Sequence, residues 1–159
     1  MNAEINVIIE GVFENCPGED WLRNVAEQAI TAEGITSDAE LGLVVTGQER
    51  VQELNRVYRG KDRPTDVLSF GMAPALEETE ATHFVTPPDG ILHLGEVIIS
   101  YPQAVIQARE HEHPIKKEIA ILIIHGVLHL CGCDHEKPEP GRLMRMREAE
   151  ILSQVASLE

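Results

Sequence analysis

The stretch PIKKEIAILIIHGVLHLCGCDH, from Pro114 to His135, combines a long apolar segment with three closely spaced histidines. Apolar residues cover nearly the whole circumference of a helix over residues 114–130, which predicts that this helix is buried on most sides. His125 and His129 are four residues apart and therefore share one helical face, about one turn apart. The stretch thus predicts a central buried helix with two histidines at the edge of a core.

The three histidines have the spacing of a metal site. Gly132 follows the helix and permits the backbone conformation in which many helices end, so the chain can turn back. His135 comes three residues later and completes the pattern H-x3-H-x5-H. Three neutral imidazoles with an open fourth position are typical of a catalytic zinc site rather than a closed structural one. We therefore predict that His125, His129 and His135 hold one Zn²⁺ ion.

This spacing matches the zinc-peptidase motif H-E-x-x-H-x-x-G-x-x-H except at one position. Gly126 stands where peptidases have the glutamate that serves as general base. Because glycine has no side chain to transfer a proton, the pattern predicts a peptidase-like metal site without the peptidase base. A zinc peptidase or amidase stays an alternative in which another carboxylate replaces that base.

Composition limits the class of protein. The 159 residues carry a net charge of −14, with 43% hydrophobic and 25% charged residues. This length and composition predict one soluble globular domain over residues 1–159 with a single core. The acidic charge argues against broad, non-specific binding of nucleic acid. No apolar run is long enough to span a membrane and no secretory signal is visible, so no membrane partner is expected.

The three cysteines do not form the even-numbered set that a disulfide framework needs, which favours a reducing cytoplasmic location. Cys131 and Cys133 flank the glycine of the histidine motif. Either thiolate could be a metal ligand, or both side chains could pack as small apolar residues, and the sequence leaves both interpretations open.

Hydrophobic periodicity outside the histidine stretch predicts the remaining elements. Strands are expected over residues 4–10, 41–46, 67–70 and 94–100, and helices over residues 17–32, 48–58, 102–111 and 142–158. Because strands come early and helices late in the chain, we predict an α+β fold in which a small mixed sheet of about four strands packs with helices. The segment from Gly71 to Gly90, rich in proline and glutamate, is interpreted as a solvated loop, with a flap near the site as the alternative.

Several titratable residues adjoin the predicted metal helix. His111 and His113 precede it and are interpreted as surface residues. Glu118 lies two turns before His125 on about the same face and is interpreted as a partly exposed carboxylate at the helix start, although it could touch the site. Asp134 could accept an N–H from a ligand histidine and fix its tautomer, or it could cap the turn.

A second group of functional candidates is basic. Between residues 50 and 63, five basic residues stand against two acidic ones, a local net charge of +3 in an acidic chain. Arg59 lies in this segment, and arginine provides planar, permanently charged donors that suit phosphate oxygens. An exposed loop with surface salt bridges is the alternative interpretation.

Three motifs in order resemble the YbeY family of metal-dependent endoribonucleases. They are RGKDRPTDVLSF at residues 59–70, LGEVIIS at residues 94–100 and HGVLHLCGCDH at residues 125–135. The resemblance implies a zinc ion on His125, His129 and His135 and marks Arg59 as important for activity. It also implies cleavage of single-stranded RNA, maturation of the 3′ end of small-subunit (16S) ribosomal RNA, and a part in ribosome quality control. The small ribosomal subunit or assembly factors are then the expected partners.

The residues leave the mechanism open at one step. Arg59 is expected to clamp the scissile phosphate, while the metal polarises it. Without the peptidase glutamate, the nucleophile could be a water activated by the metal or the 2′-hydroxyl of the RNA. A ribosome-assembly factor in which the metal only stabilises the fold is the non-catalytic alternative.

Overall fold

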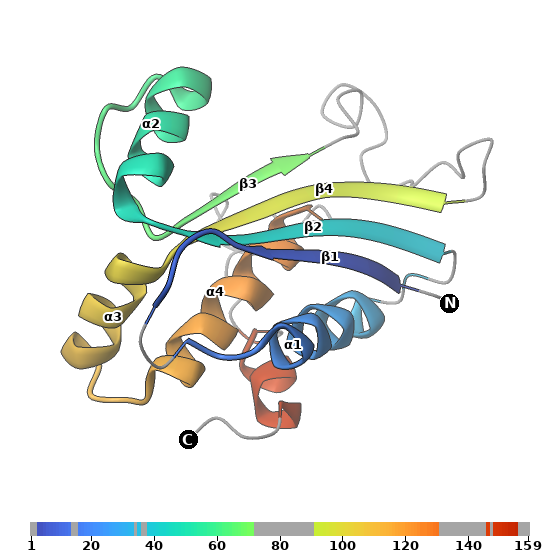
Figure 1. Cartoon of the computed structure of the whole chain (residues 1–159). Helices are drawn as coiled ribbons and strands as arrows, with labels where there is room; N and C mark the ends of the chain where they lie inside the picture. Colours follow the sequence, from blue (N-terminus) through green and yellow to red (C-terminus); the bar gives the residue numbers. More distant parts are fainter. Residues whose placement is uncertain are drawn as a thin grey trace.

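A four-stranded sheet with helices on both faces forms the framework of the computed structural model (Figure 1). The structure describes residues 3–13, 16–33, 35, 38–71, 91–130, 146 and 148–155. Five predictions therefore lie outside the described residues, namely those on His135, Asp134, Cys131, Cys133 and nearly all of the segment 71–90.

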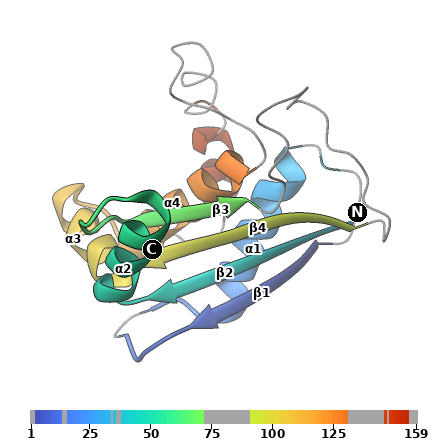
Figure 2. The ribbon, with the colours of Figure 1, turned by 90° about the horizontal axis from the view of Figure 1, so that it is seen from above.

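The elements follow one another as β1 (Ala3–Ile9), α1 (Glu19–Ala32), β2 (Asp38–Thr46), α2 (Gln48–Arg59), β3 (Val67–Gly71), β4 (Ile91–Ser100), α3 (Tyr101–Glu110) and α4 (Ile115–Leu130). Residues 148–154 are also helical. The strand order is β1-β2-β4-β3, with β1, β2 and β4 parallel and β3 antiparallel to β4 at the edge (Figure 2). The prediction of a mixed four-stranded α+β sheet is confirmed.

The order of the elements is that of the predicted ranges, although the description of strands early and helices late fits it only coarsely. Helix α1 connects β1 to β2, and α2 precedes β3, so helices and strands alternate along the first half of the chain. The physical reason is the parallel pairing of β1 with β2, since parallel neighbours require a crossover connection, usually a helix.

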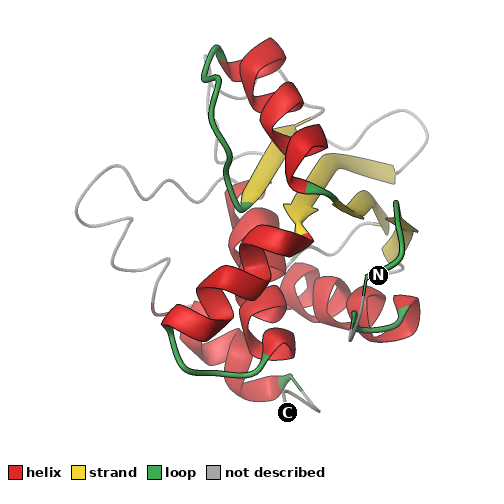
Figure 3. Ribbon diagram, turned by 60° about the vertical axis from the view of Figure 1, so that its left-hand side comes forward, coloured by secondary structure: helices red, strands yellow, loops and turns green. Residues whose placement is uncertain are grey.

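The two faces of the sheet are covered by different helices. Val97 and Ile99 of β4 belong to the large core that α1 and α4 complete, whereas Ile98 between them packs with Val51 of α2. This separation follows from the alternation of side chains along a strand. Figure 1 shows α2 on one side of the strands and α1, α3 and α4 on the other, and Figure 3 shows helices on both sides of the strands. The sheet therefore separates α2 from α4.

Helix α4 is buried on nearly all sides, which confirms the central buried helix. Its buried residues are Glu118, Ile119, Ala120, Leu122, Ile123, Ile124, Gly126, Val127 and Leu128. The more accessible positions Ile121, His125 and His129 are spaced by four and form one stripe. Among the described residues, no helix is long and apolar enough to cross a membrane.

Candidate functional site

His125 and His129 lie side by side on the accessible stripe of α4. Their ring centroids are 6.0 Å apart and their planes are inclined by 33°. The His125 side chain is about one third exposed, and His129 is exposed. The helix thus presents two imidazoles from one rigid element toward a common space, which is the local geometry that a pair of metal ligands needs.

A carboxylate from the C-terminal helical segment holds the first of these imidazoles. Nδ1 of His125 lies 2.7 Å from Oε1 of Glu148. The hydrogen bond to Glu148 raises the pKa of His125 above 6.5, against the opposing effect of burial, and the charges of Glu148 and Asp66 raise it further. A histidine that ligates a metal through one ring nitrogen usually donates the other N–H to a carboxylate. The donor set around His125 therefore fits a zinc ligand that coordinates through Nε2.

Glu148 makes the kind of contact with a histidine ring that the sequence suggests for Asp134. Twenty-three positions separate Glu148 from His125 in the chain, and no motif connects them. Its place in a predicted amphipathic helix gave no reason to select it from the other acidic residues there. Only the packing of the C-terminal segment near α4 brings the two side chains together.

We expect Glu148→Gln to weaken zinc binding about 10- to 100-fold, the usual effect of losing such a supporting carboxylate. The neutral amide oxygen accepts the hydrogen bond from Nδ1 more weakly than a carboxylate does. His125 therefore becomes a poorer zinc ligand. Competition with a chromophoric chelator measures the dissociation constant. Glu150→Gln is the matched control, because Glu150 is exposed on the same helical segment. Equal zinc affinity in the two variants would contradict this role.

Gly126 is fixed by packing against the sheet. A Cβ added there would lie 2.7 and 3.0 Å from the two methyl groups of Val97 and 3.2 Å from Oγ of Ser69. Val97 is fully buried on β4, so it has little room to move. The absence of the peptidase glutamate therefore has a structural cause, since the residue after the first histidine faces the sheet at close approach.

The basic loop after α2 has a defined shape. Gly60 ends the helix in the left-handed conformation, at φ 69°. The buried side chain of Asn55 donates to the carbonyl of Arg63 over 3.0 Å, and the N–H of Lys61 donates to the Asn55 carbonyl over 3.2 Å. Arg59 is exposed beside this loop. With Lys61 and Arg63 it borders a pocket of about 170 Å³.

Arg59 and the histidines approach the same edge strand from opposite faces of the sheet. Val67 and Leu68 of β3 form part of the basic pocket. At the next residue, Oγ of Ser69 donates to the carbonyl oxygen of Gly126 over 3.5 Å. Asp66, at the start of this strand, lies close enough to His125 to raise its pKa. The β3 edge is thus the structural link between the two predicted sites.

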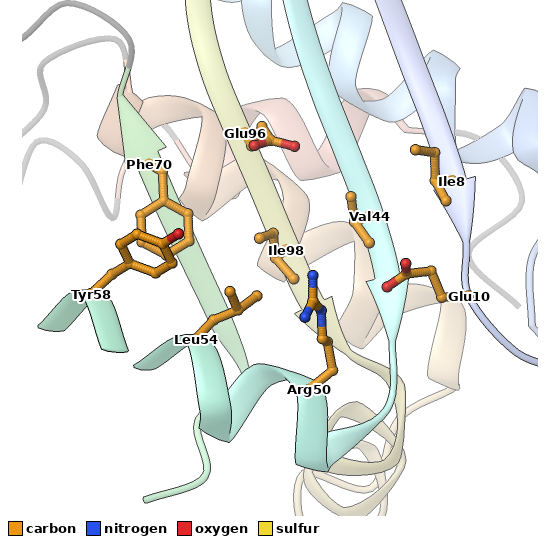
Figure 4. Close-up of a pocket in the computed structure, with 9 residues that line it drawn as sticks. All are labelled: Ile8, Glu10, Val44, Arg50, Leu54, Tyr58, Phe70, Glu96 and Ile98. Atoms are coloured by element: carbon orange, nitrogen blue, oxygen red, sulfur yellow. The ribbon is translucent and has the colours of Figure 1, made fainter. Parts of the chain in front are cut away.

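A second and larger pocket lies on the α2 side of the sheet, with a volume of about 500 Å³ (Figure 4). Tyr58 and Phe70 stand edge to face at one end, with ring centroids 5.4 Å apart. Arg50 shares the pocket with Glu10 and Glu96. Two carboxylates against one cation make this pocket less suitable for a phosphate than the basic pocket at Arg59.

The interpretation of His111 and His113 as surface residues is wrong for His113, and the interpretation of Glu118 as a partly exposed carboxylate is wrong. His111 is exposed, but the side chains of His113 and Glu118 are only 14% and 3% exposed. Burial alone would raise the pKa of Glu118, yet hydrogen bonds from His111, His113 and Gln107 lower it below its ordinary value. The corner between α3 and α4 therefore buries a carboxylate. The position of Glu118 near the start of a helix does not by itself predict this burial.

Comparisons with known proteins identify the family of this chain. A family model described as Endoribonuclease YbeY matches residues 12–156. The chain belongs to the YbeY family. An Endoribonuclease YbeY of Dehalococcoides mccartyi is 47% identical over 149 residues, covering 92% of this chain and 87% of the relative. One from Geobacillus thermodenitrificans is 40% identical over 153 residues and covers 96% of both chains.

A solved structure supports the fold of this chain. The solution structure of TM1509 from Thermotoga maritima aligns with a TM-score of 0.62 and 27% sequence identity, over 95% of this chain and 88% of that one. Membership of the YbeY family supports an endoribonuclease role, and RNA is the substrate class of such an enzyme. The individual site residues stay predictions.

Proposed function

We propose that this YbeY-family chain is a zinc-dependent endoribonuclease specific for single-stranded RNA. The observation that carries the proposal is the pair His125 and His129 on the accessible stripe of α4, with Glu148 bonded to Nδ1 of the first. His135 is the proposed third ligand, as the motif spacing predicts. A zinc ion bound there supplies Lewis-acid polarisation of a phosphoryl oxygen and acidification of water near neutral pH.

Residues around the proposed zinc site orient the histidines and provide positive charge for the RNA phosphate. Glu148 holds the ring of His125 through Nδ1 and favours the tautomer in which Nε2 can coordinate a metal. Gly126 lets α4 approach Val97 closely, which fixes the histidine stripe relative to the β3 edge. Arg59 is the proposed phosphate-binding residue, and Lys61 and Arg63 surround it with positive charge. An RNA strand that lies across the β3 edge would contact both sides.

The proposal rejects the peptidase alternative on packing grounds. A peptidase needs a carboxylate near the metal as general base, and the position after the first histidine has no room for one. Among the described carboxylates that act on His125, Glu148 pairs with its Nδ1, and Oδ2 of Asp66 accepts from Gln107 over 3.2 Å. A role for water or for the RNA 2′-hydroxyl as nucleophile is distinguished by the products: a 2′,3′-cyclic phosphate indicates the 2′-hydroxyl.

The direct test compares single-stranded and duplex RNA of one sequence with the purified protein. We expect cleavage of the single strand, loss of cleavage after removal of metal by a chelator, and recovery when zinc is added back. Cleavage that is unchanged by the chelator would contradict the zinc-dependent mechanism. Zinc-dependent proteolysis without RNA cleavage would favour the peptidase class instead.

We expect Arg59→Ala to lower RNA cleavage about 10- to 100-fold, because a charged hydrogen bond to phosphate contributes roughly 1.5–3 kcal/mol. The slope of log affinity against log salt should fall by about one unit. Arg50→Ala is a matched control on the same helix, where the arginine shares its pocket with two carboxylates. Equal losses in both variants would indicate a general charge effect rather than a phosphate site at Arg59.

The proposed biological substrate is the 3′ end of 16S ribosomal RNA, with a further part in ribosome quality control in the cytoplasm. Family membership supports this assignment, and the small ribosomal subunit or assembly factors are the proposed partners. A chain with a net charge of −14 gains little from non-specific attraction to RNA, so a partner that presents the strand is expected. Mapping of 16S 3′ ends after depletion of the protein tests the assignment.

A further inference from the structure

The corner between α3 and α4 gathers two imidazoles around one buried carboxylate. Nδ1 of His111 and Nε2 of His113 lie 3.0 and 2.6 Å from the same oxygen, Oε1 of Glu118. The ligand atoms that the three side chains offer lie within 4.8 Å of one another. Glu118 is buried, and His111 on the outer side is more than half exposed. The group therefore has an inner anionic end and an outer side open to solvent.

We propose that His111, His113 and Glu118 form a second zinc-binding site, distinct from the site at His125 and His129. Two histidines and one glutamate are a donor set that holds zinc in several hydrolases, with an open fourth position. Bonds of about 2.0–2.2 Å place neighbouring donors of a tetrahedral ion about 3.3 Å apart. The present separations of 3.0 and 2.6 Å are therefore shorter by about 0.3 and 0.7 Å, a difference that rotation of the two imidazole side chains can supply.

The backbone of the corner holds the two histidines in place without metal. His111 N–H donates to the Gln107 carbonyl over 2.9 Å, and His113 N–H donates to the Ala108 carbonyl over 3.0 Å. Between them Glu112 adopts a left-handed conformation at φ 55°, which reverses the chain and lets both rings reach the same carboxylate. Because the donors are already assembled, binding costs little ordering entropy.

The surroundings of Glu118 also suit a metal ligand. Nε2 of Gln107 donates to the second carboxylate oxygen, Oε2, over 2.9 Å, as outer hydrogen-bond donors commonly do for ligating carboxylates. A buried carboxylate is costly unless positive charge or several donors compensate it. A divalent cation between the three side chains provides that compensation, with the exposed side of His111 as its route of entry.

Zinc stoichiometry tests the proposal on the full-length chain, without any measurement of RNA cleavage. We titrate metal-free protein with zinc against a chromophoric chelator. Two tight equivalents are expected for the wild type, and one for Glu118→Gln or His113→Ala. His129→Ala should also bind one, and the double variant His113→Ala/His129→Ala should bind none. The cobalt absorption spectrum of His113→Ala should then differ from that of His129→Ala, because the two variants retain different zinc sites with different ligands.

His93→Ala is the matched control. His93 of β4 pairs with Glu40 of the neighbouring strand β2 and belongs to neither proposed zinc site. This variant should keep two equivalents. Glu118→Gln preserves the shape of the buried side chain and one oxygen that can accept from the histidines, although its NH2 group cannot accept from Gln107. Circular dichroism verifies its fold. A wild type with a single equivalent that survives Glu118→Gln and His113→Ala would overturn the second site. That result would leave the proposed endoribonuclease intact, because the first site is measured separately.

Discussion

Gly126→Glu, which completes the peptidase motif, is expected to unfold the protein rather than produce a peptidase. The new side chain begins where a Cβ already lies 2.7 Å from a methyl group of Val97. It would also bring a carboxylate between α4 and the sheet, where no cation is available among the described neighbours of Gly126. We expect a loss of roughly 4–5 kcal/mol, a large part of the stability of an ordinary domain.

The smaller change Gly126→Ala isolates the steric part of this effect. Helix propensity alone would make alanine about 1 kcal/mol more stable than glycine in a helix interior. Overpacking in a core opposes it by about 1–3 kcal/mol, and the stiff, β-branched Val97 cannot rotate away easily. We therefore expect net destabilisation in urea unfolding. The sign of the change decides whether close packing or propensity dominates at this position.

A double-mutant cycle with Val97→Ala shows whether the contact itself is responsible. Removing both methyl groups makes room for the new Cβ, so the double variant should be more stable than the sum of the single losses by about 1 kcal/mol or more. Gly47→Ala is the control, because nothing lies within 4 Å of a Cβ there. Gly126→Ala that matches or exceeds wild-type stability would refute the packing explanation.

The features that could be predicted from sequence are local in the chain. The burial of α4 and the shared face of His125 and His129 follow from a period of 3.6 residues, and both are found in the structure. The four strands were identified because each is a short β-branched or apolar run. Likewise, the basic character of the loop beside Arg59 requires no knowledge of the fold.

The remaining features depend on contacts between distant segments. Glu148 reaches His125 only because the C-terminal segment packs near α4. The separation of Arg59 from the histidines by the sheet depends on strand order, which periodicity does not specify. The burial of Glu118 depends on the reversal at Glu112. The sequence shows that Gly126 replaces the peptidase glutamate. The packing reason, close contact with Val97 of β4, is evident only in the structure.

His129→Ala is expected to remove zinc from the first site and lower RNA cleavage about a thousandfold or more. The lost charge stabilisation amounts to several kcal/mol, and each 1.36 kcal/mol is a factor of ten in rate. His129 is exposed, so the alanine leaves no cavity, and the fold should survive. Cleavage rates and zinc content measured on the same preparation test this, with His93→Ala as control.

Because His129 is exposed, the same variant also distinguishes a catalytic metal from a purely structural one. If the metal is catalytic, circular dichroism and urea unfolding of His129→Ala should resemble those of the metal-free wild type, and both should lack nuclease activity. If the metal only supports the fold, the wild type should show no nuclease activity at all and the variant should unfold. Full cleavage by a folded, zinc-depleted His129→Ala protein would exclude the proposed centre, because no donor would remain one turn from His125 to complete it.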